Sequence, residues 1–134
     1  MSTSKIVCFI LLKNGKVLVE KRKVYKEADP GAVTIPGGHV KDGETLLDAC
    51  KREFSEEFGL SCRDFQFVCT LLYTASNSEH MELNYFFCNG WKGMPKAAEA
   101  DKLMWLHHTE LEKLSFDEDR KAIAKLKSLN AELF

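Results

Sequence analysis

The first third of the chain has the alternation and turn signals of β-strands. Apolar runs at residues 6–12 and 17–21 flank Asn14-Gly15, and Asn-Gly between two such runs is the strongest short signal for a β-hairpin. A short strand is expected at residues 33–35. Pro36-Gly37-Gly38 then breaks the strand pattern and begins a loop that extends to residue 43.

After Thr45 the apolar period becomes that of an α-helix. Thr45 followed by Asp48 resembles a capping box, and Gly59 stands where a left-handed C-terminal cap belongs. The pattern therefore predicts a helix over residues 46–58. The positions expected to face the core are Leu47, Cys50, Phe54 and Phe58.

The second half of the chain returns to strands and ends in a helix. Residues 65–73 and 81–88 are expected to form half-buried strands around a polar turn, and residues 102–107 a last strand. Ser115 with Glu118 favours a cap for a final helix that starts near residue 117. Strands and helices in this order predict one mixed α/β domain over residues 1–134.

Charge and cysteine content narrow the classes of partner. The chain has 19 basic and 20 acidic residues, whereas a protein that binds nucleic acid polymers usually carries a basic excess. The apolar run at residues 6–12 is too short to span a membrane. The five cysteines are odd in number and form no CxxC pair. We expect them to be reduced, in a cytoplasmic protein without polymer or membrane partners.

The predicted helix carries an unusual cluster of acids. Glu53, Glu56 and Glu57 stand at i, i+3 and i+4, so their carboxylates share one helix face and repel one another. Arg52 can pair with Glu56 one turn on, but one cation does not neutralise the cluster. A hard divalent cation such as Mg²⁺, which prefers oxygen ligands, would do so.

Two glycines precede this helix and extend the pattern. Gly37 and Gly38 allow a backbone to approach a ligand closely. The segment therefore favours a magnesium site beside a glycine-built loop, which suits a polyphosphate. From the glutamates alone, an exposed acidic helix face after a glycine turn is the better interpretation.

The full spacing resembles the Nudix box, which covers 23 residues from Gly38 to Leu60. Phe54 is the one departure, because the box prefers an aliphatic residue there. The order of hairpin, Pro-Gly-Gly turn, helix, strand pair and final helix is similar to small MutT-like members over nearly the whole chain. The matching fixed positions are Gly38, Glu44, Arg52, Glu53, Glu56, Glu57 and Gly59.

This resemblance implies a fold and an activity. The fold is a Nudix-type α/β/α sandwich, in which a mixed sheet lies between the box helix and the C-terminal helix. The activity is Mg²⁺-dependent hydrolysis, with Mn²⁺ as a possible substitute, of a phosphoanhydride bond in a nucleoside diphosphate linked to another group. The substrates of MutT-like members are (d)NTPs, including oxidised purine nucleotides such as 8-oxo-dGTP. These enzymes cleave the triphosphate to a nucleoside monophosphate and pyrophosphate.

The resemblance also assigns roles to residues of the box. Glu56 and Glu57 are metal ligands, Glu53 is a ligand or the general base, and the carbonyl of Gly37 completes the shell. Glu99 matches a late-loop glutamate that serves as ligand or base, or else is an ordinary loop carboxylate. Arg52 and Glu44 orient the carboxylates. The expected catalytic residues are Arg52, Glu53, Glu57 and Glu99.

The chain resembles MutT-like members less closely at the positions expected to contact the substrate. Lys23 stands where MutT-like members have an arginine, and Ile35 stands where they have an aromatic residue. Gly38 is the first residue of the box and is expected beside the phosphates. Asp119 occupies the place of a base-reading asparagine, where it could accept hydrogen bonds from guanine. The alternative for Asp119 is an ordinary acid at the start of a helix, favoured there by the helix dipole.

Other activities of the same family remain open. Hydrolases of ADP-ribose usually have a proline soon after the box, and this chain has none between Gly59 and Pro95. Hydrolases of dinucleoside polyphosphates usually have a tyrosine somewhat later than Tyr73. A nucleotide sensor without catalysis would be expected to lack a box carboxylate, and none is lacking. The expected assembly is a monomer or a homodimer.

Overall fold

The computed structural model describes residues 3–22, 29–96 and 102–134. The two α-helices are α1 (Leu46–Phe58) and α2 (Asp117–Leu129), and short 3₁₀ helices span Leu111–Lys113 and Ala131–Leu133. The strands are β1 (Ser4–Ile10), β2 (Leu12–Lys13), β3 (Lys16–Lys21), β4 (Val33–Thr34), β5 (Gly37–His39), β6 (Cys62–Thr74), β7 (His80–Trp91) and β8 (Lys102–His107).

The strands form two sheets. One has the order β5-β1-β7-β6, in which β1 and β7 run parallel and the other pairs are antiparallel, so it is the expected mixed sheet. In the second sheet β3 pairs with β2, β4 and β8, always antiparallel. The partners of β3 are thus all in the second sheet, and within the described residues it does not pair with β1.

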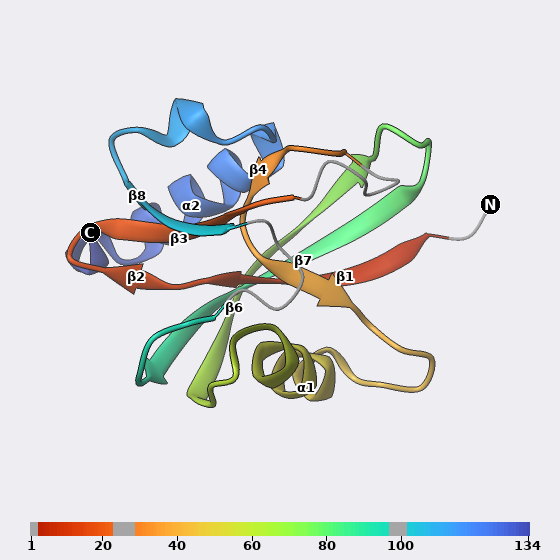
Figure 1. The fold of residues 1–134 in the computed structure, drawn as a ribbon, viewed down its shortest axis with the longest axis horizontal. Coiled ribbons are helices and arrows are strands. Elements are labelled where there is room, and N and C mark those ends of the chain that lie inside the picture. Colours follow the sequence, from red (N-terminus) through yellow and green to blue (C-terminus); the bar gives the residue numbers. More distant parts are fainter. Residues whose placement is uncertain (1–2, 23–28, 97–101) are drawn as a thin grey trace.

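Strand β1 is buried on both faces and separates two hydrophobic cores. Its residues alternate in direction, as a strand requires: Val7 and Phe9 join the core that contains α1, whereas Ile6, Cys8 and Ile10 join the core that contains α2. The two helices therefore lie on opposite sides of the mixed sheet (Figure 1). This arrangement is the expected α/β/α sandwich.

Helix α1 has the predicted bounds and caps. The Thr45 side chain accepts a hydrogen bond from the backbone N–H of Asp48, and Gly59 ends the helix with φ 67°. The prediction for Leu47 is wrong, because 46% of this residue is exposed. The buried residues of α1 are Ala49, Cys50, Phe54 and Phe58. The buried face is therefore rotated from the predicted one, and it includes Ala49 in place of Leu47.

The cap predicted for α2 is also wrong. The Ser115 hydroxyl accepts a hydrogen bond from the backbone N–H of Val33 at 2.9 Å, and so joins the chain before α2 to strand β4. No side chain caps the first turn of α2. Strands β6 and β7 extend beyond their predicted ends, because they pair from Cys62–Trp91 to Thr74–His80. Backbone pairing stabilises these strand ends, and the alternation of hydrophobic residues does not predict them.

Candidate active site

Two glycines bring strand β5 against its neighbours. A Cβ atom on Gly37 would stand 2.3 Å from the carbonyl oxygen of Val7 in β1, and one on Gly38 would stand 2.0 Å from Oε2 of Glu53 in α1. Real Cβ atoms do not approach other atoms so closely, so neither position accepts a side chain without a shift. The Gly-Gly pair therefore lets the helix and the sheet close around the Glu53 carboxylate.

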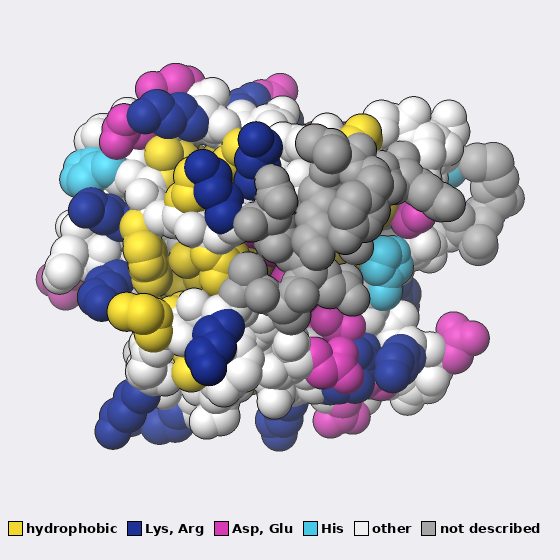
Figure 2. All heavy atoms as spheres, in the orientation of Figure 1, with side chains coloured by type: hydrophobic (Ala, Val, Ile, Leu, Met, Phe, Trp, Pro, Cys, Tyr) yellow, Lys and Arg dark blue, Asp and Glu magenta, His cyan; other side chains and the backbone are white. Residues whose placement is uncertain are grey.

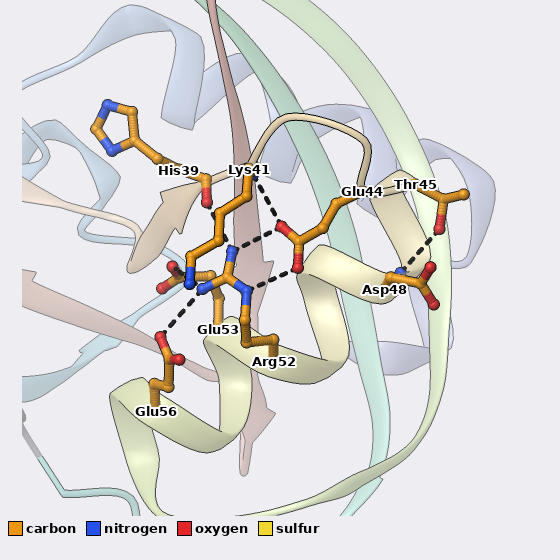
Figure 3. Close-up of polar contacts among 8 residues, drawn as sticks. All are labelled: His39, Lys41, Glu44, Thr45, Asp48, Arg52, Glu53 and Glu56. Carbon is orange, nitrogen blue, oxygen red and sulfur yellow. Dashed lines mark hydrogen bonds and ion pairs between the residues drawn. The ribbon is translucent and has the colours of Figure 1, made fainter.

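Arg52 is the centre of the polar contacts on α1. Its Nε and Nη2 atoms donate to the two oxygens of Glu44 at 2.7 and 2.8 Å. Nη1 donates to Glu53 at 2.7 Å and to Glu56 at 3.1 Å, and Nη2 also donates to the carbonyl of His39 at 3.0 Å (Figure 3). One guanidinium thus contacts three carboxylates and the end of β5.

These contacts keep the cluster charged. Hydrogen bonds from Arg52 and from the backbone N–H of Lys41 lower the pKa of Glu44 to about 2, and the carboxylates of Glu44 and Glu53 raise the pKa of Arg52. Two positive side chains, Arg52 and Lys41, stand against the three carboxylates that Arg52 contacts, so negative charge is still in excess. On the face shown in Figure 2, acidic side chains gather over α1.

The donor set of this face fits a hard divalent cation. Glu53, Glu56 and Glu57 supply only oxygen ligands from successive positions of one helix, and Mg²⁺ and Mn²⁺ bind such groups. Among residues 3–22, 29–96 and 102–134, no three acidic, histidine or cysteine side chains already converge on one point. Glu53 and Glu56 are instead directed toward Arg52.

A cavity of about 130 Å³ adjoins this cluster. Strand β5 forms their common wall, because Gly37, Gly38 and His39 line the cavity while Gly38 contacts Glu53. The cavity extends from β5 toward β4 and the start of α2. Its apolar walls include Ile6, Cys8, Ile35, Met81, Leu83 and Phe116. A flat apolar group could enter here while a charged chain reaches the carboxylates.

Asp119 lies on the wall of this cavity, with 2% of its surface exposed. Its Oδ2 accepts from the backbone N–H of Ile35 at 3.0 Å, and its Oδ1 accepts from the hydroxyl of Tyr85 at 2.6 Å. Burial raises the pKa of Asp119 to about 6, although both hydrogen bonds act in the opposite direction. Asp119 is therefore not an exposed helix-start acid: it joins α2 to β7 and to the segment after β4.

The remaining predicted residues are distributed as follows. Ile35 is buried and lines the cavity, 4% exposed. Glu57 is half-buried on α1 beside Glu53. Lys23 and Glu99 lie outside the described residues, so their predicted roles stay predictions.

Several charged or polar cavity residues were missed by the sequence interpretation, among them Glu20, Thr34 and Glu79. Glu20 and Thr34 are buried, 7% and 5% exposed, and Glu79 lines the mouth. Glu20 could have been suspected, because it is a charged residue in an otherwise apolar strand. No local pattern marks Thr34 or Glu79, since each reaches the cavity only through the pairing of distant strands.

The expectations for the cysteines and for membrane-spanning segments can be compared with the structure. All five cysteines are free thiols. Within the part of the chain that the structure describes, no helix has the length and apolar character needed to cross a membrane.

Comparison with known proteins gives a consistent set of matches. Residues 1–126 match the NUDIX domain. The chain is 30% identical over 116 residues to the 8-oxo-dGTP diphosphatase of Buchnera aphidicola subsp. Schizaphis graminum, which covers 87% of this chain and 86% of that protein. It is 32% identical over 118 residues to the 8-oxo-dGTP diphosphatase of Escherichia coli K12, which covers 87% and 90%.

A solved structure has the same fold. The MutT NUDIX hydrolase from Burkholderia pseudomallei superposes with a TM-score of 0.83 at 22% identity, and the match covers 94% of this chain and 99% of that one.

Proposed function

The chain belongs to the Nudix family, and from this premise we propose that it uses a divalent cation to hydrolyse a phosphoanhydride bond in a nucleoside diphosphate linked to another group. The observation that carries the proposal is the contact of Arg52 with Glu44, Glu53 and Glu56. It holds three carboxylates together beside the strand that also lines the cavity, and one guanidinium does not neutralise all of them. Such a cluster binds a cation, and the cation then binds phosphate oxygens.

The proposed substrates are nucleoside triphosphates, cleaved to a monophosphate and pyrophosphate. Oxidised purine nucleotides such as 8-oxo-dGTP are included because the two bacterial relatives are 8-oxo-dGTP diphosphatases. The apolar cavity would hold the base. Asp119 and Ile35 would lie along the edge of the base, and Gly38 beside the phosphates. Lys23 remains a proposed phosphate contact.

Mg²⁺ is the proposed cation, with Mn²⁺ as a substitute. Glu53, Glu56 and Glu57 would hold it, together with the carbonyl of Gly37 and with Glu99. When bound, the cation would neutralise phosphate oxygens and lower the pKa of a water molecule.

The protein's own groups would orient and activate the reactants. Arg52 holds Glu53 and Glu56 in fixed directions, and Glu44 holds Arg52. A carboxylate at Glu53 or Glu57 would accept the proton of the attacking water. Gly38 leaves the room that the Glu53 carboxylate requires. The cluster therefore sets the geometry before the substrate arrives.

A substrate screen tests this function. Purified protein with Mg²⁺ would be given normal and oxidised nucleoside triphosphates, ADP-ribose and diadenosine polyphosphates, and pyrophosphate would be separated from phosphate among the products. We expect pyrophosphate and a nucleoside monophosphate from triphosphates. Preferential cleavage of ADP-ribose or of a dinucleotide would replace the proposed substrate, and nucleotide binding without turnover would indicate a sensor.

A further inference from the structure

His39 and Glu79 meet at the mouth of the cavity. Nε2 of His39, the last residue of β5, lies 3.5 Å from Oε2 of Glu79, which immediately precedes β7. Both residues line the cavity. The pair therefore connects β5, which borders the carboxylate cluster, to the turn between β6 and β7.

The backbones of His39 and Glu79 are held by hydrogen bonds, so the points from which the two side chains extend are fixed. The carbonyl of His39 accepts from Arg52 at 3.0 Å. The carbonyl of Glu79 accepts from the backbone N–H of Ala75 at 2.8 Å, and its N–H donates to the side chain of Asn77 at 3.1 Å. Each side chain thus extends from a fixed point on its own side of the mouth.

The Glu79 carboxylate is incompletely satisfied in this position. Its Oε2 atom is shielded from solvent and has no hydrogen-bond partner among the described residues. At 3.5 Å the distance from Nε2 of His39 is longer than that of a normal hydrogen bond. His39, by contrast, keeps 65% of its side chain exposed. The ring can therefore leave Glu79 and contact another anion without leaving its strand.

The cavity offers few groups to an anionic ligand. Among the described residues that line it, only Arg22 and His39 have side chains that can carry positive charge. The acidic residues of the lining are Glu20, Asp29, Glu79 and Asp119. Figure 3 shows the carbonyl of His39 directed toward Arg52 and its ring pointing away from α1. The ring thus stands on the wall between the cavity and the carboxylate face, where a phosphate chain that joins them would pass.

We propose that His39 is a phosphate-binding residue of this site and that Glu79 lowers ligand affinity by competing for its imidazole. The proposal rests on the proposed function for the identity of the ligand. A polyphosphate accepts a hydrogen bond from the imidazole N–H, and Glu79 must release the ring for this to occur. Any free energy that stabilises the His39–Glu79 pair is then subtracted from the free energy of binding.

Two substitutions should have opposite effects on affinity. His39→Ala should weaken binding roughly three- to tenfold, because a charge-assisted contact is lost at an exposed site. Glu79→Ala should strengthen binding about two- to fivefold, the equivalent of one partly exposed ion pair. In the double variant, the benefit of Glu79→Ala should disappear. A merely structural role for either residue would weaken binding in both single variants.

The measurement is calorimetric titration with inorganic tripolyphosphate in Mg²⁺, together with KM and kcat for a nucleoside triphosphate. His80→Ala is the matched control, because His80 is an exposed neighbour of Glu79 whose ring contacts Thr74. We expect KM to change more than kcat. Unchanged affinity in His39→Ala, or weaker binding in Glu79→Ala, would overturn the proposal. If the wild type hydrolyses no triphosphate, the proposed function fails, but the titration still decides the role of His39.

Discussion

Arg52 and Glu44 form a two-bond ion pair between the box helix and the loop before it. Nε and Nη2 of Arg52 lie 2.7 and 2.8 Å from Oε2 and Oε1 of Glu44. Planar two-bond pairing fixes the orientation of a guanidinium and not merely its position. The Nη1 group of Arg52 is therefore directed at Glu53 and Glu56. Glu44 thus orients these two carboxylates through Arg52 without any need to contact the substrate.

Loss of the Glu44 charge should disturb activity through Arg52. We expect Glu44→Gln to lower kcat about 10- to 100-fold, the usual effect of removing a supporting partner of a metal ligand. Asp48→Asn, on the exposed first turn of the same helix, is the control and should change kcat little. Because the folded-state pKa of Glu44 is lowered to about 2, its contribution to stability exists above pH about 4.5 and is lost as the pH falls toward 2. Glu44→Gln should lack this acid-dependent loss in thermal melts.

Removal of the cation should abolish turnover. We expect excess chelator to stop hydrolysis and added Mg²⁺ or Mn²⁺ to restore it. Glu57→Gln should lower kcat on the order of 10²–10³-fold while the circular dichroism spectrum is retained, because Glu57 is not among the buried residues of α1. Glu112→Gln, an exposed acid far along the chain, serves as the control. Full activity in chelator would contradict the proposed metal site.

The two glycines of β5 should respond differently to the same added methyl group. In Gly37→Ala the new Cβ would meet backbone atoms of β1, which cannot move alone, so we expect stability to fall by about 1–3 kcal/mol. In Gly38→Ala it would meet the end of the Glu53 side chain, which can rotate away. We expect stability to change less, but kcat to fall on the order of a hundredfold because a reactive carboxylate is displaced. Equal melting temperatures for both variants would contradict this distinction.

Asp119 should make stability depend on pH between about 4 and 6. Its folded-state pKa is raised from 3.8 to about 6 by burial, so its contribution favours the folded state most below pH 3.8 and is lost as the pH rises through 6. A shift of this size corresponds to about 3 kcal/mol. Relative to Asp119→Asn, the wild type should lose stability over this range. Asp117→Asn gives a control of opposite sign, because Arg120 lowers the pKa of Asp117; denaturant titrations at several pH values measure both.

Asp119 should also distinguish bases if the cavity holds the base as proposed. We expect Asp119→Asn to raise KM for dGTP about ten- to a hundredfold, because a charge-assisted hydrogen bond contributes about 1.5–3 kcal/mol. Asparagine retains an acceptor for the N–H of Ile35, and its amide can donate to the hydroxyl oxygen of Tyr85, so it tests recognition with less disruption of the core than alanine. KM for dCTP should change much less. Equal shifts for both nucleotides would leave Asp119 with a structural role alone.

Local patterns in the sequence were sufficient for elements whose determinants are close together along the chain. The bounds of α1 follow from Thr45 and Gly59, because both caps act on backbone groups within one turn. The hairpin at Asn14-Gly15 follows because both residues adopt positive φ, 52° and 75°. The spacing of Glu53, Glu56 and Glu57 places their side chains on one helix face whatever the tertiary contacts are.

Only the tertiary structure determined which groups meet across the sequence. Asp119 reaches Ile35 and Tyr85, 84 and 34 residues away, and His39 reaches Glu79 through the arrangement of β5, β1 and β7. Ser115 binds Val33 instead of capping α2, because a polar side chain takes whichever partner the packed chain brings near. Periodicity encodes which face of an element is buried, but the partner across that face depends on how the whole chain folds. The sequence alone therefore determined the acidic helix face and its glycine loop, whereas folding determined the cavity beside them.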